Sequence, residues 1–281
     1  MAVRIVTDST ADLPPGAAQQ LGISIVPLSV IFGEQVYKEG SDITHDLFYD
    51  MLIHGRAHPT TSAPSLGDFM AVYEPLLEET DEIVSIHVSA KLSATYNNAC
   101  QAARLVADRG ARIEVIDSQV VSMGLGFLAL RAAKALQAGT GIDDVRGIVE
   151  RSIPHVHTIF VLDTLEYLRR GGRIGRARAF LGAVLRVKPL LSLRDGEVHP
   201  EERVRTKAHA LERIYQIVTA QPRIQEAAVA YSTNAQEAEE MRRRLAAALP
   251  HVNIYVTRLG PVIGVHGGPG VLGVGTMEGE E

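Results

Sequence analysis

Residues 83–95 read IVSIHVSAKLSAT, and this stretch decides the fold class. It begins with an apolar run of strand length at residues 83–88. It then passes through a polar turn and leads into a helical pattern at residues 93–107. A short β-branched run that leads into a helix is the repeating unit of a parallel sheet with crossover helices. The stretch therefore predicts an α/β protein.

The same unit recurs through the first half of the chain. Apolar runs at residues 3–6, 23–30 and 113–116 predict further strands, the second of them interrupted by Pro27. Helical patterns cover residues 66–77, 122–137 and 143–151. Ser65 is well placed as the N-cap of the first of these helices, because Asp68 follows three residues later. We expect a parallel sheet with helices on its faces.

From about residue 153 the pattern changes. Asp195-Gly196 is a hairpin signal leading to Val198, so antiparallel pairing is expected there. The predicted strands are residues 159–162, 189–193, 227–231, 253–256 and 271–274, and the predicted helices are residues 206–219 and 235–249. We therefore expect two domains with a ligand between them: a parallel-sheet α/β domain at residues 1–150 and a mixed-sheet α/β domain at residues 151–281.

Composition excludes several classes of protein. The net charge of −5, from 28 basic and 33 acidic residues, predicts no general attraction to nucleic acid. Cys100 is the only cysteine, so no internal disulfide can form, which fits a reducing cytoplasm. No apolar run approaches the roughly 18 residues that a membrane span needs. We expect a cytoplasmic protein that is not integral to a membrane.

Five polar or glycine-rich segments carry the candidate chemistry. At least three follow a strand-like run, where hydroxyls and backbone N–H groups make sites for a small anion. The segments are residues 7–14 (TDSTADLP), 59–65 (PTTSAPS), 89–96 (SAKLSATY), 163–174 (DTLEYLRRGGRI) and 264–270 (GVHGGPG).

Three hydroxyls are candidates for an anion site. Ser65 occupies the expected helix cap, which leaves Thr61 and Ser62 free to point elsewhere. Ser93 stands at the head of a helix, where its hydroxyl and the helix dipole favour a carboxylate. As an alternative, Ser93 serves only as an N-cap. The segment from Asp8 to Asp12 is either a capped turn or a wall of the ligand site.

Basic residues and one histidine add to these candidates. Arg173 lies in a dense basic stretch beside two glycines, and Arg205 lies in a second basic element, a setting that suits a carboxylate or a phosphate. An alternative for the first stretch is a solvated helix end. His266 lies among glycines, in what we expect to be a loop, where it can donate a hydrogen bond to an oxyanion. The histidines show no metal-ligand spacing, so no metal is predicted.

Taken in order and with these spacings, the five segments resemble the DegV family of bacterial fatty-acid-binding proteins. The resemblance runs from Ile5 to Gly273. It implies a long-chain fatty acid between two α/β domains and no other cofactor. It also implies a partner, a separate fatty acid kinase that phosphorylates the bound acid to an acyl phosphate for phospholipid synthesis.

The resemblance also assigns roles to individual residues. Thr61 and Ser93 match the family positions that bind the carboxylate, with Ser62 as a close neighbour. Positions matching His266, Arg173 and Arg205 lie near the head group. The chain departs from the family pattern at Ala94, where a glycine is usual. A methyl group there either crowds the carboxylate or, if the backbone is already helical, changes nothing.

Other functions remain as alternatives. A serine esterase or thioesterase would use Ser93 and His266, but the G-x-S-x-G motif of the nucleophile elbow is absent around Ser93. A sugar- or amino-acid-binding domain calls for more aromatic and acidic loop residues. The chain contains no G-x-x-x-x-G-K-[ST] motif, so no nucleotide site is predicted. We expect an accessory binding protein with no catalytic residue of its own.

Overall fold

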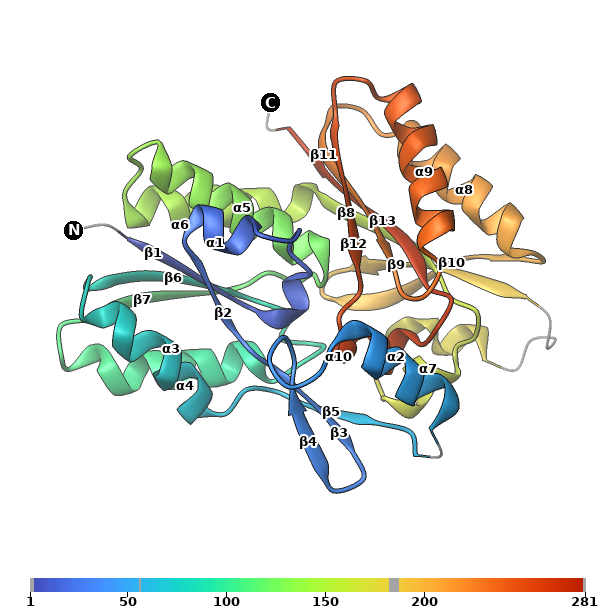
Figure 1. Cartoon of the computed structure of the whole chain (residues 1–281). Helices are drawn as coiled ribbons and strands as arrows, with labels where there is room; N and C mark the ends of the chain where they lie inside the picture. The colour runs from blue at the N-terminus through green and yellow to red at the C-terminus, as the bar shows by residue number, and fades with distance from the viewer. Residues whose placement is uncertain (1–2, 56, 182–186, 280–281) are drawn as a thin grey trace.

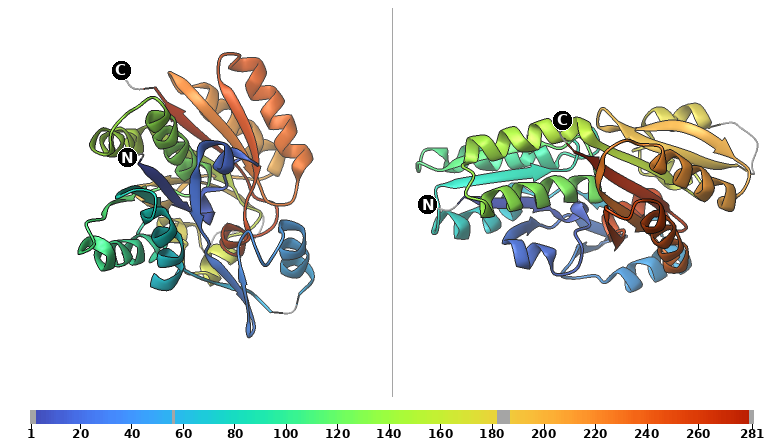
Figure 2. Two further views of the ribbon diagram at one scale, coloured as in Figure 1. Left: turned by 60° about the vertical axis from the view of Figure 1, so that its left-hand side comes forward. Right: turned by 90° about the horizontal axis from the view of Figure 1, so that it is seen from above.

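The computed structural model describes residues 3–55, 57–181 and 187–279. Within these residues a four-stranded and a six-stranded sheet lie side by side, with a three-stranded sheet at the edge of the molecule (Figure 1). Figure 2 shows the two large sheets from two further sides. No helix in the described part of the chain is both long and apolar enough to cross a membrane.

The four-stranded sheet is parallel throughout and covered on both faces. Ile5 packs into the core on one face, and its neighbour Val6 packs into the core on the other. Burial on both faces explains why these strands read as continuous apolar runs. The strands, in spatial order, are β2 (Ile23–Val26), β1 (Arg4–Asp8), β6 (Glu82–His87) and β7 (Arg112–Asp117). One face carries α3 (Leu66–Leu77) and α4 (Thr95–Ala107); the other carries α1 (Ala17–Leu21), α5 (Met123–Gln137) and α6 (Ile142–Ser152).

The six-stranded sheet is mixed. β11 pairs parallel with β12, and the remaining pairs are antiparallel. In spatial order the strands are β10 (Glu197–Val204), β9 (Lys188–Arg194), β8 (Val156–Val161), β13 (Leu272–Glu278), β11 (Ile224–Tyr231) and β12 (Asn253–Arg258). Helices α8 (Lys207–Thr219) and α9 (Ala235–Ala248) cover one face of this sheet (Figure 1). The predicted fold class, a parallel sheet followed by a mixed sheet, is confirmed.

Two predictions that depend on hydrogen bonds between residues close in sequence are confirmed, the cap of α3 and the hairpin turn. Ser65 caps α3: its hydroxyl accepts from the Asp68 N–H at 3.2 Å, and its own N–H donates to the Asp68 carboxylate at 2.9 Å. Asp195 and Gly196, with φ of 50° and 80°, form the tight turn between β9 and β10. Each feature depends on residues close in sequence, so the amino-acid pattern suffices to predict it.

The single strand predicted at residues 23–30 is wrong, because it is two strands in two sheets. β2 ends at Val26, and β3 (Ser29–Phe32) pairs with β4 (Gln35–Lys38) and β5 (Thr60–Ser62) in the three-stranded sheet. Pro27 has no N–H to donate to a ladder, so the chain leaves the parallel sheet there.

Helices from opposite ends of the chain pack on the three-stranded sheet, and the sequence did not predict them. Phe48 and Tyr49 of α2 (His45–His54) share a buried cluster with Val262 and Val265 of α10 (Pro261–Gly267). The remaining short helical elements are α7 (Glu166–Arg170), η1 (Ser9–Ala11), η2 (Ile153–His155) and η3 (Gly175–Phe180).

The buried carboxyl of Asp12 joins the two halves of the chain. Its Oδ2 accepts a hydrogen bond from the Ser122 hydroxyl at 2.6 Å, immediately before α5. Its Oδ1 accepts one from the Gly260 N–H at 2.9 Å, immediately before α10. Burial raises the pKa of Asp12 to about 8, against the lowering effect of the Ser122 hydrogen bond. Glu39 lies beside it and accepts from the Val262 N–H at 2.9 Å; burial raises its pKa to about 7.

Asp12→Asn should flatten the dependence of stability on pH. Because the pKa of Asp12 is higher in the folded protein than in the unfolded chain, the folded state keeps a proton that the unfolded state releases. This contribution to stability is complete below about pH 4 and is lost as pH rises towards 8. The measurement is the free energy of unfolding from urea titrations at a series of pH values. In the unmodified protein, release of the Asp12 proton should lower this free energy by up to about 1.4 kcal/mol per pH unit. In the variant the free energy should fall less steeply with pH.

The matched control is Asp143→Asn. Asp143 is exposed and paired with Arg112, and its pKa lies below the ordinary value, so it does not titrate above about pH 5. This variant should keep the pH slope of the unmodified protein. An Asp12→Asn protein with that same slope would contradict the assignment.

Candidate functional site

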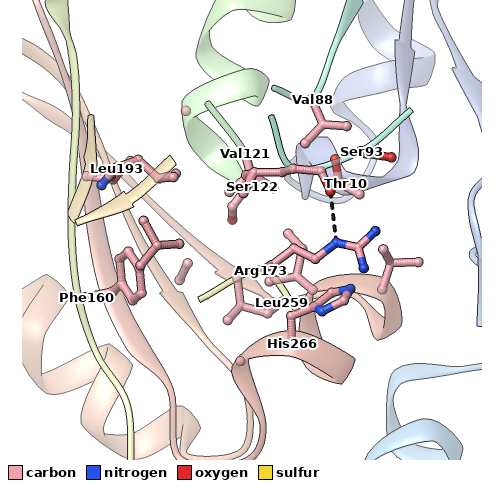
Figure 3. A pocket seen from close by; sticks show the side chains of 18 of the residues that line it. Thr10, Val88, Ser93, Val121, Ser122, Phe160, Arg173, Leu193, Leu259 and His266 are labelled. Carbon is pink, nitrogen blue, oxygen red and sulfur yellow. Dashed lines mark hydrogen bonds between the residues drawn. The ribbon is translucent and has the colours of Figure 1, made fainter. Parts of the chain in front are cut away.

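A cavity of about 490 Å³ lies between the six-stranded sheet and the segments that follow β1 and β6 (Figure 3). Its wall is largely apolar and includes Val88, Phe160, Leu193, Leu259 and Ile263. Ligand sites in proteins typically measure about 300–1,000 Å³ and combine an apolar wall with a few placed polar groups. The cavity therefore has the size and character of a small-molecule site.

Polar side chains gather at one end of this cavity. Thr61, on β5, and His266, on α10, share a hydrogen bond of 2.9 Å between Oγ1 and Nε2. Ser62 and Ser93 also line the cavity. Figure 3 shows Ser93, Arg173 and His266 together, away from Phe160 and Leu193. The structure thus brings together five of the six residues singled out from the sequence, from four separate parts of the chain.

His266 lies in a helix, which corrects the predicted loop. It is in the last turn of α10, which begins at Pro261 and ends before Gly268, where φ is 78°. Proline at the first helical position and glycine after the last one are the ordinary signals for such a helix. The several glycines of this segment favoured the prediction of a loop instead. The helix holds the imidazole towards the cavity.

The imidazole of His266 is partly buried, and the loss of contact with water decides its charge. Burial lowers its pKa to about 4, and the positive charges of Arg173 and His58 contribute in the same direction. The ring is therefore neutral at pH 7, with Nε2 engaged by Thr61. Among the described residues Nδ1 has no hydrogen-bond partner. A neutral ring at this place can take part in hydrogen bonds without placing an unpaired charge in an apolar wall.

Ser93 lies slightly outside the helix that it was expected to begin. Helix α4 starts at Thr95, and Ala94 occupies the N-cap position. The Ser93 hydroxyl lies 2.8 Å from the Thr95 hydroxyl and accepts from the Thr95 N–H at 3.3 Å. Ala94 lines the cavity in an ordinary helical conformation, φ −73° and ψ −1°. Its backbone is one that any residue adopts, so the glycine expected here from the family resemblance is not needed for conformation.

The two candidate arginines differ in position. Arg173 is exposed at the polar end of the cavity, where Nε donates to the Leu92 carbonyl at 3.1 Å and Nη1 to the Gly171 carbonyl at 2.7 Å. It thereby bridges the loop after β6 and the loop after α7. Arg205 is exposed just after β10 and is not among the residues that line the cavity.

Further hydroxyl side chains line the cavity, among them Thr10 and Ser122. Thr10 belongs to the segment expected to form either a capped turn or a wall of the ligand site. Asp8 accepts from the Thr10 hydroxyl at 2.5 Å and from its N–H at 3.1 Å. Ser122 was not singled out, because its sequence indicates only the start of a helix. Its φ of 57° is unusual for a residue other than glycine, and no sequence signal predicts that.

The geometry does not favour an esterase. The Ser93 hydroxyl is hydrogen-bonded to Thr95, whereas Nε2 of His266 is hydrogen-bonded to Thr61. A nucleophilic serine needs its base within hydrogen-bond reach. No group of three or more histidine, cysteine, aspartate or glutamate side chains within the described residues is arranged to hold a metal ion.

Comparison with known structures identifies similar proteins across nearly the whole chain. A fatty-acid-binding DegV family protein from Thermus thermophilus is 37% identical, with a TM-score of 0.92 over 99% of this chain and 100% of that one. DegV from Bacillus subtilis, described as a fatty acid binding protein, is 34% identical, with a TM-score of 0.91 over 99% and 100%. A stearic acid-binding protein from Eubacterium ventriosum is 26% identical, with a TM-score of 0.91 over 98% of each chain.

A family model agrees with these structures. The model described as "Uncharacterised protein, DegV family" matches residues 2–279. The match covers all three sheets and every segment that lines the cavity. This chain belongs to the DegV family.

Proposed function

We propose that this chain holds a long-chain fatty acid in the cavity and presents its carboxylate to a separate ATP-dependent kinase, which converts it to an acyl phosphate. In this proposal the chain is a cytoplasmic binding subunit and performs no chemistry itself. The observation that carries the proposal is a largely apolar cavity in which Thr61, Ser93 and the neutral His266 lie at one end. The fatty-acid-binding descriptions of similar structures support it.

The apolar wall suits an acyl chain. Each methylene group that leaves water contributes roughly 0.8 kcal/mol to binding, so chain burial supplies most of the affinity. The cavity reaches from the polar end to Phe160 and Leu193 on its other side (Figure 3). A carrier of this kind keeps the acyl chain away from water, while the carboxylate stays at the polar end of the cavity.

The polar end suits the carboxylate. In our proposal Thr61 and Ser93 donate hydrogen bonds to its oxygens, with Ser62 nearby. His266 holds the Thr61 hydroxyl in place through Nε2. Because His266 is neutral, the balancing positive charge comes from Arg173, which remains in contact with solvent. Hydrogen bonds to a charged group are stronger than those between neutral groups, so few are needed.

The kinase step requires only that the carboxylate be positioned. A carboxylate oxygen attacks the γ-phosphorus of ATP held by the kinase, and ADP leaves. The carboxylate carries one negative charge and the acyl phosphate about two, so Arg173 is better matched to the product than to the acid. Arg205 lies outside the cavity lining, and we propose that it acts where the kinase approaches.

Thr61→Val and Ser93→Ala should each weaken fatty-acid binding about tenfold to a hundredfold. Each removes a hydrogen bond to a charged group, worth roughly 1.5–3 kcal/mol. The measurement is titration calorimetry of delipidated protein with palmitate. The matched control is Thr60→Val, on the same strand but on its opposite face and outside the cavity lining.

Thr60→Val should bind palmitate as the unmodified protein does. If both site variants also keep full affinity, the head group lies elsewhere. If organic extraction of the unmodified protein yields no acyl chain, and palmitate does not raise its melting temperature, the carrier function itself is wrong.

Arg173→Ala should slow kinase-dependent phosphorylation more than it weakens acid binding, because the guanidinium matches the charge of the product. Acyl phosphate formed from ATP and the kinase is the readout, beside palmitate affinity. Arg178→Ala is the control: Arg178 belongs to the same basic stretch, is exposed, and does not line the cavity. If Arg173→Ala, Arg178→Ala and Arg205→Ala all slow phosphorylation equally, the arginines act in kinase docking rather than at the head group.

A further inference from the structure

The register of β8 and β13 shows which pair of facing residues, or rung, of the sheet lies farthest from the polar end of the cavity. β13 begins a few residues after α10, which carries His266, and runs away from it. Val271, Gly273 and Gly275 line the cavity in turn along this direction. At about 3.3 Å per residue, Gly275 lies roughly 13 Å beyond Val271. Gly275 pairs with Thr158, which also lines the cavity, so this rung is the far end.

Helix α5 closes the cavity at this rung. A Cβ atom placed on Gly275 would lie 3.5 Å from a ring carbon of Phe127 and 4.0 Å from the backbone nitrogen of Gly124. Phe127 is fully buried, so its ring has little room to move. On the partner strand, the Thr158 hydroxyl accepts from the Leu193 N–H at 3.2 Å. The far wall is therefore made of closely packed groups.

The absence of a side chain at Gly275 is not required by its backbone. Gly275 lies within β13 and is not among the glycines with positive φ. Gly273 differs, because a Cβ there would lie 2.7 Å from the Cβ of Phe160, closer than packing allows. At Gly275 a methyl group would make only ordinary contacts. A side chain at this position would fit the fold and take space from the end of the cavity.

We propose that Gly275 determines the length of acyl chain that the cavity accepts, by leaving the last rung open to the chain terminus. The inference rests on the proposed function, because it concerns the same fatty acid. It assigns chain-length selection to the rung of Gly275 and Thr158, and not to the residues around the carboxylate. Long saturated acids fill the space above Gly275, whereas short ones end before it.

Gly275→Val tests this proposal with delipidated protein and a series of saturated acids: dodecanoate, myristate, palmitate and stearate. Affinity for the longest acid that the unmodified protein binds well should fall roughly tenfold or more, since the valine displaces at least two methylene groups. Affinity for dodecanoate should stay unchanged. Gly275→Ala should give a smaller loss of affinity, again larger for the long acids than for the short ones. Gly141→Val is the control, since Gly141 has ordinary φ, has open space around it and is not among the residues that line the cavity.

Leu193→Ala gives the opposite test and keeps the proposal falsifiable if valine at position 275 impairs folding. Removing this side chain beside Thr158 enlarges the far end. The affinity ratio of arachidate to palmitate should rise severalfold. An equal loss for all acids in Gly275→Val and Gly275→Ala, or an unchanged ratio in Leu193→Ala, would overturn the proposal while leaving fatty-acid binding intact. Failure of the unmodified protein to bind any acid would instead overturn the proposed function, and this inference with it.

Discussion

The cavity depends on a junction of hydrogen bonds at the carboxyl group of Asp12. This buried group accepts from Ser122 at the start of α5 and from Gly260 at the start of α10, so it connects the parallel-sheet half with the mixed-sheet half. The backbone carbonyl of the same residue accepts from the Thr257 hydroxyl at 2.8 Å. A buried polar group must be satisfied, because leaving it unpaired costs roughly 1–3 kcal/mol. The contacts at Asp12 therefore hold their segments in one arrangement.

The polar end of the cavity follows from this junction. Helix α10 carries His266, and its first turn is held by Asp12 and Glu39. Ser122 lines the cavity while it donates to Asp12. Close packing supports the same arrangement: a Cβ on Gly171 would lie 2.1 Å from Nδ1 of His266, so only glycine allows the loop after α7 to approach the ring. His266 is thus held from both sides and partly removed from water, which, with the nearby charge of Arg173, keeps it neutral.

The sequence predicted the elements whose signals are local. The α3 helix matches its predicted bounds because apolar spacing and the Ser65 cap both act within a few residues. Two failures have physical reasons. Residues 23–30 form one apolar run, but Pro27 ends the ladder and sends the second half into another sheet. Residues 261–267 form a seven-residue helix, too short for a periodic pattern and rich in glycine, and its stability comes from packing against α2.

The sequence by itself determined the α/β class, most strands and helices of the two large sheets, the Ser65 cap, the hairpin at Asp195 and Gly196, and the segments that carry hydroxyls, because backbone hydrogen bonds and side-chain periodicity act over short distances. Only the tertiary structure decided which of those segments meet. Thr61 and His266 are 205 residues apart and share a hydrogen bond, whereas Arg205 stays outside the cavity lining. Such contacts depend on how sheets and helices pack face to face. Burial, which sets the pKa of Asp12 and of His266, exists only after that packing has formed.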